Sequence, residues 1–143
     1  MNRALRDLVL AGMLLAIGVL AVHCEPSTNL KPALTSGIVE ITSDSGSPDL
    51  MQGLNFQWKM TQTGRHMGNP VNLTEKHVGM RIVVYFVQDV NGGKTITNWG
   101  NFYKFPILSK RPVLSIEPNA IDRIDCFIRA VDALDCVFAA SWE

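Results

Sequence analysis

The sequence has little charge and no excess of either sign. Its 143 residues include 13 lysines and arginines and 13 aspartates and glutamates, and Lys110 and Arg111 are the only adjacent basic pair. Nucleic-acid binders usually carry a clustered basic face, so we expect no nucleic-acid partner. Glycine-rich phosphate loops and the short strings typical of zinc proteases and serine hydrolases are also missing. The sequence therefore predicts a non-enzymatic protein with no cofactor and no bound metal.

Long apolar runs are absent except at one place. The stretch from Leu8 to Val22 has no polar side chain; Arg3 and Arg6 precede it and His23 follows it. This layout is typical of an export signal, so residues 1–24 are predicted to be a signal peptide or a membrane anchor. Fifteen helical residues span about 22 Å of a core roughly 30 Å thick, which favours cleavage. In either case the domain is exported, and the chain contacts a membrane only through residues 8–22 if they are retained.

Cysteine is scarce as well, with Cys24, Cys126 and Cys136 as the three examples. In an oxidising compartment we expect Cys126 and Cys136 to form a disulfide, which stabilises a domain by roughly 2 to 4 kcal/mol. The alternative is that both are small, buried apolar side chains. No C-x-x-C pair occurs and no histidine lies near Cys126 or Cys136, which disfavours a zinc site.

After a polar linker over residues 25–36, short strand-like segments predict one all-β domain over residues 37–143. Leu54 to Met60 alternates apolar and polar residues, which is typical of a half-buried strand. The region 61–79 is predicted to be a long loop with a short edge strand near Pro70 to Leu73. Asn91-Gly92 lies between two further strands and predicts a hairpin. The other expected strands are Gly37–Thr42, Met80–Gln88, Lys94–Phe105 and Val113–Glu117.

Residues 119–141 fit two structures. At helical spacing Ile121, Ile124 and Ile128 share one face and Asn119 is a candidate N-cap. At a spacing of two, the same segment forms a hairpin that turns near Asp132 and places the two cysteines opposite each other. Ten residues of helix span about 15 Å, too far for a disulfide, so the choice between helix and hairpin also decides the bridge.

The stretch CFIRAVDALDCVFAAS at 126–141 resembles the last hairpin of bacterial fibronectin type III and immunoglobulin-like modules. The resemblance covers only these residues, and no early cysteine is present to bridge two sheets. It implies an immunoglobulin-like β-sandwich of about seven strands and favours the hairpin. An α+β fold with a C-terminal amphipathic helix is the alternative.

The aromatic side chains near residue 100 are the candidate binding surface. Trp99, Phe102 and Tyr103 do not all fall on one side of an extended strand, so part of this area is expected to face solvent. The sequence thus predicts an exported binding or assembly module of the cell envelope, a surface, or a virion or appendage. We expect a protein partner, with carbohydrate as another candidate; the oligomeric state is left open. The alternatives are a membrane-anchored subunit of an envelope complex and a small secreted hydrolase or inhibitor.

Overall fold

The computed structural model describes residues 37–106 and 111–142, with side chains placed up to residue 140. The predicted leader (1–24) and linker (25–36) lie outside the described residues. Within the described part, the elements are eight strands and one 3-10 turn, η1 (Glu75–His77). The all-β prediction is confirmed. None of the described segments forms an apolar helix of membrane-spanning length.

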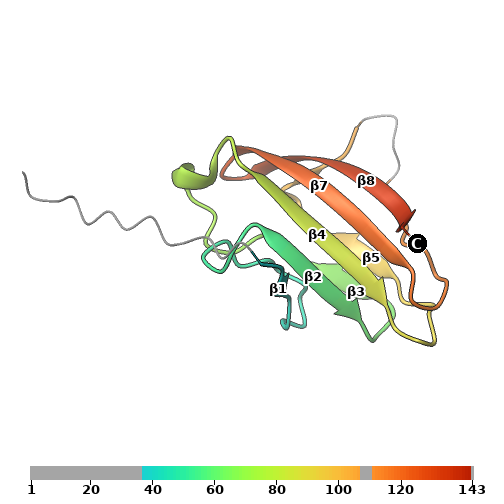
Figure 1. Cartoon of the computed structure of the whole chain (residues 1–143). Coiled ribbons are helices and arrows are strands. Elements are labelled where there is room, and N and C mark those ends of the chain that lie inside the picture. Colours follow the sequence, from blue (N-terminus) through green and yellow to red (C-terminus); the bar gives the residue numbers. More distant parts are fainter. Residues whose placement is uncertain (1–36, 107–110, 143) are drawn as a thin grey trace, which may run out of the picture. The chain divides into compact units, whose positions relative to one another are not determined.

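Six strands form the larger sheet in the order β1-β2-β4-β7-β8-β6 (Figure 1). Parallel pairing joins β1 to β2, β2 to β4 and β6 to β8, whereas β4 to β7 and β7 to β8 are antiparallel. The strands are β1 (Val39–Glu40), β2 (Asn55–Met60), β4 (Arg81–Gln88), β6 (Tyr103–Lys104), β7 (Ile121–Ala130) and β8 (Ala133–Trp142).

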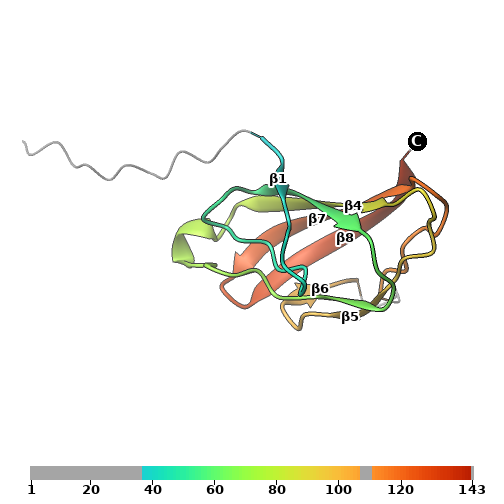
Figure 2. The same ribbon diagram turned by 90° about the horizontal axis from the view of Figure 1, so that it is seen from below.

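The two remaining strands, β3 (Arg65–Met67) and β5 (Ile96–Trp99), pair in parallel and form a second layer. Figure 2 shows β5 on the side opposite β4, with the central strands of the large sheet above it. The core fills the space between the layers, and alternate residues of the sheet point into it. Its most completely buried members include Phe56, Met60, Met67, Ile82, Phe86, Ile124, Ile128 and Leu134.

The strand predicted at 54–60 is confirmed as β2. Phe56, Trp58 and Met60 are buried, while Asn55 and Lys59 face solvent. The predicted strand at 80–88 is confirmed as β4. In the loop that follows β2, the short strand is β3 at 65–67; near residue 71 there is only an isolated bridge between Asp49 and Val71.

The hairpin predicted between 80–88 and 94–105 is wrong. Strand β4 pairs with β2 and β7, and the chain crosses after Gln88 into the other layer, where β5 pairs with β3. Hydrogen bonds of the Gln88 side chain stand in for the backbone pairing that a hairpin would have here. Its Oε1 accepts a hydrogen bond from the Lys94 N–H at 2.9 Å, and its Nε2 donates to the Lys94 and Ser115 carbonyls, each at 2.8 Å. A buried amide thus fixes the crossing.

The strand predicted at Val113–Glu117 is also wrong, since this segment has no regular secondary structure. The buried Asp122 carboxylate accepts hydrogen bonds from the Ser115 N–H at 2.7 Å and the Ser115 hydroxyl at 2.8 Å. Because a side chain satisfies the Ser115 backbone, the segment runs along the sheet without joining it.

At 119–141 the structure has the hairpin, and the helical alternative is wrong. Strands β7 and β8 are joined by Val131 and Asp132, with Ala130 opposite Ala133 and Cys126 opposite Cys136. Asn119 has a positive φ of 61° and lies in a turn, so it is not a helix N-cap. Two ten-residue strands with alternate burial account for the whole segment.

Candidate functional site

The predicted aromatic surface is largely buried. Trp99 and Tyr103 are only 5% and 6% exposed, and Phe102 is half-buried. The Trp99 ring lies edge-on to Phe86 at 5.7 Å, to Tyr103 at 5.9 Å and to Phe105 at 5.3 Å between ring centroids. Trp99 contacts Phe86 of the large sheet across the core, and Tyr103 and Phe105 contact the Trp99 ring, so Trp99 and Tyr103 belong to the core and Phe105 packs against it. The prediction of an exposed surface is wrong for Trp99 and Tyr103.

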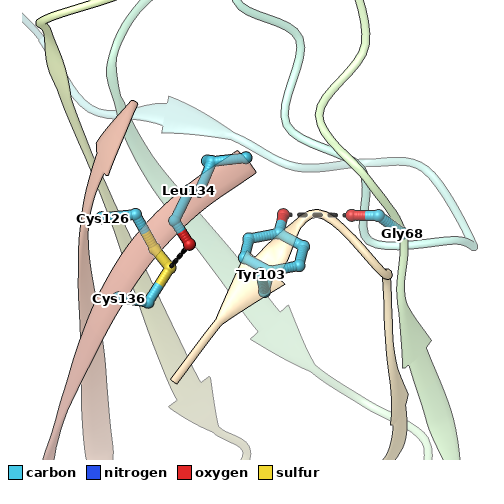
Figure 3. Close-up of a disulfide and its surroundings, with 5 residues drawn as sticks. All are labelled: Gly68, Tyr103, Cys126, Leu134 and Cys136. Carbon is cyan, nitrogen blue, oxygen red and sulfur yellow. Dashed lines mark hydrogen bonds between the residues drawn. A yellow bond between two sulfur atoms is a disulfide. The ribbon is translucent and has the colours of Figure 1, made fainter. Parts of the chain in front are cut away.

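Tyr103 also connects two segments. Its hydroxyl donates a hydrogen bond of 3.0 Å to the carbonyl of Gly68, which follows β3 (Figure 3). Burial raises the pKa of this phenol well above its ordinary value, because the charged form loses its hydration. Tyr103 is therefore neutral and structural at physiological pH.

The predicted disulfide is confirmed. Cys126 on β7 and Cys136 on β8 are directly opposite and bonded, with a Cα–Cα distance of 4.1 Å, and both are buried (Figure 3). Short distances of this kind mark the antiparallel pairs whose backbone groups point away from each other. The disulfide links the two strands near the middle of the C-terminal hairpin, and both cysteines are part of the hydrophobic core.

A polar groove of about 300 Å³ lies beside the edge strand β1. Hydroxyl, carboxylate and amide side chains line it together with apolar ones, a mixture suited to a small polar molecule. Segments far apart in the sequence build it, which is why no motif revealed it. The lining residues are Val39, Glu40, Ile41, Thr42, Ser43, Ser45, Ser47, Asp49, Gln52, Phe56 and Val71.

Asp49 is the anchored carboxylate of this groove. It accepts hydrogen bonds from the Asn72 amide at 2.7 Å, the Gln52 amide at 3.1 Å and the Met51 N–H at 3.1 Å. These bonds, chiefly that from Asn72, hold the pKa of Asp49 below its ordinary value despite partial desolvation. Its lone pairs are used to hold the rim together, so Asp49 organises the groove.

The outer face of the large sheet carries two exposed apolar side chains next to each other. Phe127 on β7 is 40% exposed and Val137 on β8 is 59% exposed. Phe127 lies opposite Asp135, and Val137 lies opposite Asp125, so the two are diagonal neighbours. Among residues 37–106 and 111–142, no three His, Cys, Asp or Glu side chains gather into a group that could hold a metal ion.

Neither family models nor curated proteins nor solved structures give a match to this chain. The likeness to fibronectin type III and immunoglobulin-like modules therefore rests on the C-terminal hairpin residues. The features from which a function can be argued are the buried disulfide, the groove beside β1 and the outer face of β7 and β8.

Proposed function

We propose that this chain is an exported immunoglobulin-like β-sandwich that serves as a non-enzymatic binding or assembly module of the cell envelope, a surface, or a virion or appendage. The observation that carries the proposal is the buried Cys126–Cys136 disulfide. Such bonds form and persist in oxidising compartments and are rare in the cytosol. The apolar stretch Leu8–Val22 supplies an export signal for the same compartment.

The two layers and the hairpin support the sandwich part of the proposal. Strands β3 and β5 lie across the core from the large sheet, and the β7–β8 hairpin is the segment that resembles immunoglobulin-like modules. The parallel pairs β1–β2 and β2–β4 are less usual in such a sandwich, so the likeness is one of architecture.

The chemistry of the buried polar groups favours binding over catalysis. Gln88, Tyr103 and Asp122 all bond to backbone groups of neighbouring segments. Each satisfies a backbone donor or acceptor that packing removes from water, which is a structural role. Function is therefore expected on the surface, where Phe127 and Val137 offer apolar area to a protein partner.

Export and oxidation are tested together by intact mass. The full chain is produced in cells, the fractions are alkylated without reductant, and the protein is weighed. We expect a chain that lacks its leader, is lighter by about 2 Da from loss of two hydrogens, and resists alkylation at Cys126 and Cys136. A full-length, cytosolic chain with both thiols alkylated contradicts the proposal. A full-length oxidised chain in the membrane fraction supports the anchored alternative.

A carbohydrate is a second candidate ligand, and the groove beside β1 favours it. Hydroxyls of Thr42, Ser43 and Ser45 line an opening of about 300 Å³, large enough for a small saccharide. Saccharides titrated into labelled protein should shift the amide signals of residues 39–49. Thr42→Arg, which fills the opening, should abolish these shifts, whereas Thr61→Arg on an exposed site outside the groove should not. Equal shifts in both variants contradict binding in the groove.

A further inference from the structure

The groove beside β1 carries charge of one sign only. Among the described residues that line it, Glu40 and Asp49 are the charged ones, and there is no lysine, arginine or histidine. The other polar groups are the hydroxyls of Thr42 and three serines and the amide of Gln52. Hydroxyls both donate and accept hydrogen bonds, whereas ionised carboxylates only accept them. The lining therefore favours a ligand that has hydroxyl groups and a cationic donor.

The segment that carries the serines is held in place by its own hydrogen bonds. The Ser47 N–H donates to the Ser43 hydroxyl at 3.1 Å, and the hydroxyls of Ser45 and Ser47 share a bond of the same length. The Gly68 N–H donates to the Ser45 carbonyl at 2.6 Å, which ties the segment to the residues after β3. A site that does not have to rearrange loses less free energy on binding, so these hydroxyls suit a small ligand.

The charge of Asp49 is not neutralised within the described residues. Its hydrogen bonds come from Asn72, Gln52 and the Met51 N–H, which are neutral donors, and none of the ion pairs in this part of the chain includes it. These bonds, chiefly that from Asn72, lower the pKa of Asp49 and keep the carboxylate ionised at neutral pH. The groove therefore has a fixed negative charge.

Glu40 shows directly how an ammonium group is accommodated here. The Nζ of Lys59, a residue outside the groove lining, lies 3.1 Å from Oε1 of Glu40, and the two side chains are 58% and 51% exposed. Exposed pairs of this kind contribute little to stability, so the ammonium group of a ligand can replace that of Lys59 at low cost.

We propose that this groove binds an amino sugar whose amine is free and protonated. The ammonium group lies against Glu40 and Asp49, and the sugar hydroxyls bond to the serine and threonine hydroxyls. A neutral sugar leaves both carboxylates without a cationic partner and an acidic sugar is repelled, so charge complementarity selects this class. The inference names the class of saccharide and rests on the carbohydrate candidate proposed above for the same groove.

Three sugars that differ only at C2 test the ammonium group: glucosamine, N-acetylglucosamine and glucose. Each is titrated into the labelled, oxidised protein at about pH 6, where the amine of glucosamine is protonated, and the amide signals of residues 39–49 are followed. We expect glucosamine to bind about tenfold more tightly than the other two sugars. High salt screens exposed charges and should remove most of this difference.

Two variants of the Glu40–Lys59 pair should move the affinity for glucosamine in opposite directions. Glu40→Gln removes a carboxylate and should weaken binding about threefold. Lys59→Met removes the competing ammonium group and should strengthen binding about twofold. Both variants break the same ion pair, so the loss of that pair cannot explain opposite effects. Glu117→Gln is the matched control, because Glu117 is an exposed carboxylate outside the groove lining, and it should bind like the wild type.

The possible results separate the ammonium group from the saccharide. Equal affinities for the three sugars, or the same change in both variants of the pair, overturn the role of the ammonium group and leave the carbohydrate candidate standing. If no sugar shifts the signals of residues 39–49 up to about 100 mM, both are overturned. Neither outcome changes the mass test of export and oxidation.

Discussion

Removal of the disulfide gives the most direct test of how this domain is stabilised. Cys126 and Cys136 are separated by 10 residues, so the bridge closes a short loop in the unfolded chain. With a loop of about 10 residues, the loop-entropy relation gives about 2.7 kcal/mol at 25 °C. The variant Cys126→Ala/Cys136→Ala also loses two buried sulfur atoms, which adds about 1 kcal/mol for lost packing. We therefore expect the free energy of unfolding to fall by about 3 to 4 kcal/mol.

Urea unfolding followed by tryptophan fluorescence measures this loss, and the wild type refolded in reductant separates its two parts. The reduced wild type keeps both sulfur atoms and should lose only the loop contribution, about 2 to 3 kcal/mol. The double variant should be indifferent to reductant. If the reduced wild type and the variant both lose less than about 1 kcal/mol, the bridge does not constrain the unfolded chain as argued.

The remaining predictions concern the core and its buried polar groups. Trp99→Ala should lower the free energy of unfolding by about 3 to 5 kcal/mol and Phe102→Ala by clearly less; a fully stable Trp99→Ala would mean that this ring is not core. Burial raises the pKa of Tyr103, so as the pH rises the phenol loses its proton in the unfolded chain before it does in the folded chain. The free energy of unfolding is therefore expected to be constant below about pH 10 and to fall above it by up to about 1.4 kcal/mol per pH unit. Tyr103→Phe should abolish this loss at alkaline pH, which is measured as the urea midpoint against pH, and should lower the free energy of unfolding by about 1 to 2 kcal/mol at neutral pH. An unchanged alkaline slope would contradict the assignment of this loss to Tyr103. Gln88→Met removes the three hydrogen bonds that fix the crossing after β4, so it should lower the free energy of unfolding by about 3 kcal/mol and speed the hydrogen exchange of the Lys94 amide. The control Gln57→Met, on the outer face of the sheet, should lower it by less than about 1 kcal/mol. Equal losses in the two variants would contradict the role of Gln88.

Strands with one buried face could be predicted from the sequence because their period is local. Phe56, Trp58 and Met60 alternate with polar residues, and that alternation alone identifies β2. The cysteine pair could be predicted only together with the hairpin: a turn near Asp132 places Cys126 opposite Cys136, but the same residues also fit helical spacing. In both cases the deciding information lies within about twenty residues of chain.

The strand partners could not be predicted in the same way. A turn with Asn91-Gly92 suits a hairpin and also suits a crossing between layers, because both need positive φ values there; Gly92 has a φ of 62°. The side chain of Gln88 decides between them through bonds to Lys94 and Ser115, and side-chain capping of this kind has no sequence signature.

The candidate site was missed for a related reason. Alternation separates Phe102 from Trp99 and Tyr103, but it does not say which side faces the opposing sheet. Trp99 became core because Phe86 of β4 lies across from it, a contact between distant segments. The groove beside β1 likewise combines Val39, Asp49 and Val71, which only the folded chain brings together.

The sheet topology also sets the order in which this domain can assemble. Among the described strands, only β7 and β8 are partners joined by a tight turn; β1 and β2 also follow each other but residues 41–54 separate them, and every other pair has at least one strand between its two members along the chain. Local pairs form fast and distant ones slowly. We therefore expect the β7–β8 hairpin, which carries the disulfide, to be the folding nucleus. Because β4 pairs with β7, the large sheet cannot be completed before residues 121–142 have been synthesised. A chain built in this way stays unfolded during most of its synthesis, and this would be compatible with the export that we propose, because a translocon passes unfolded chains.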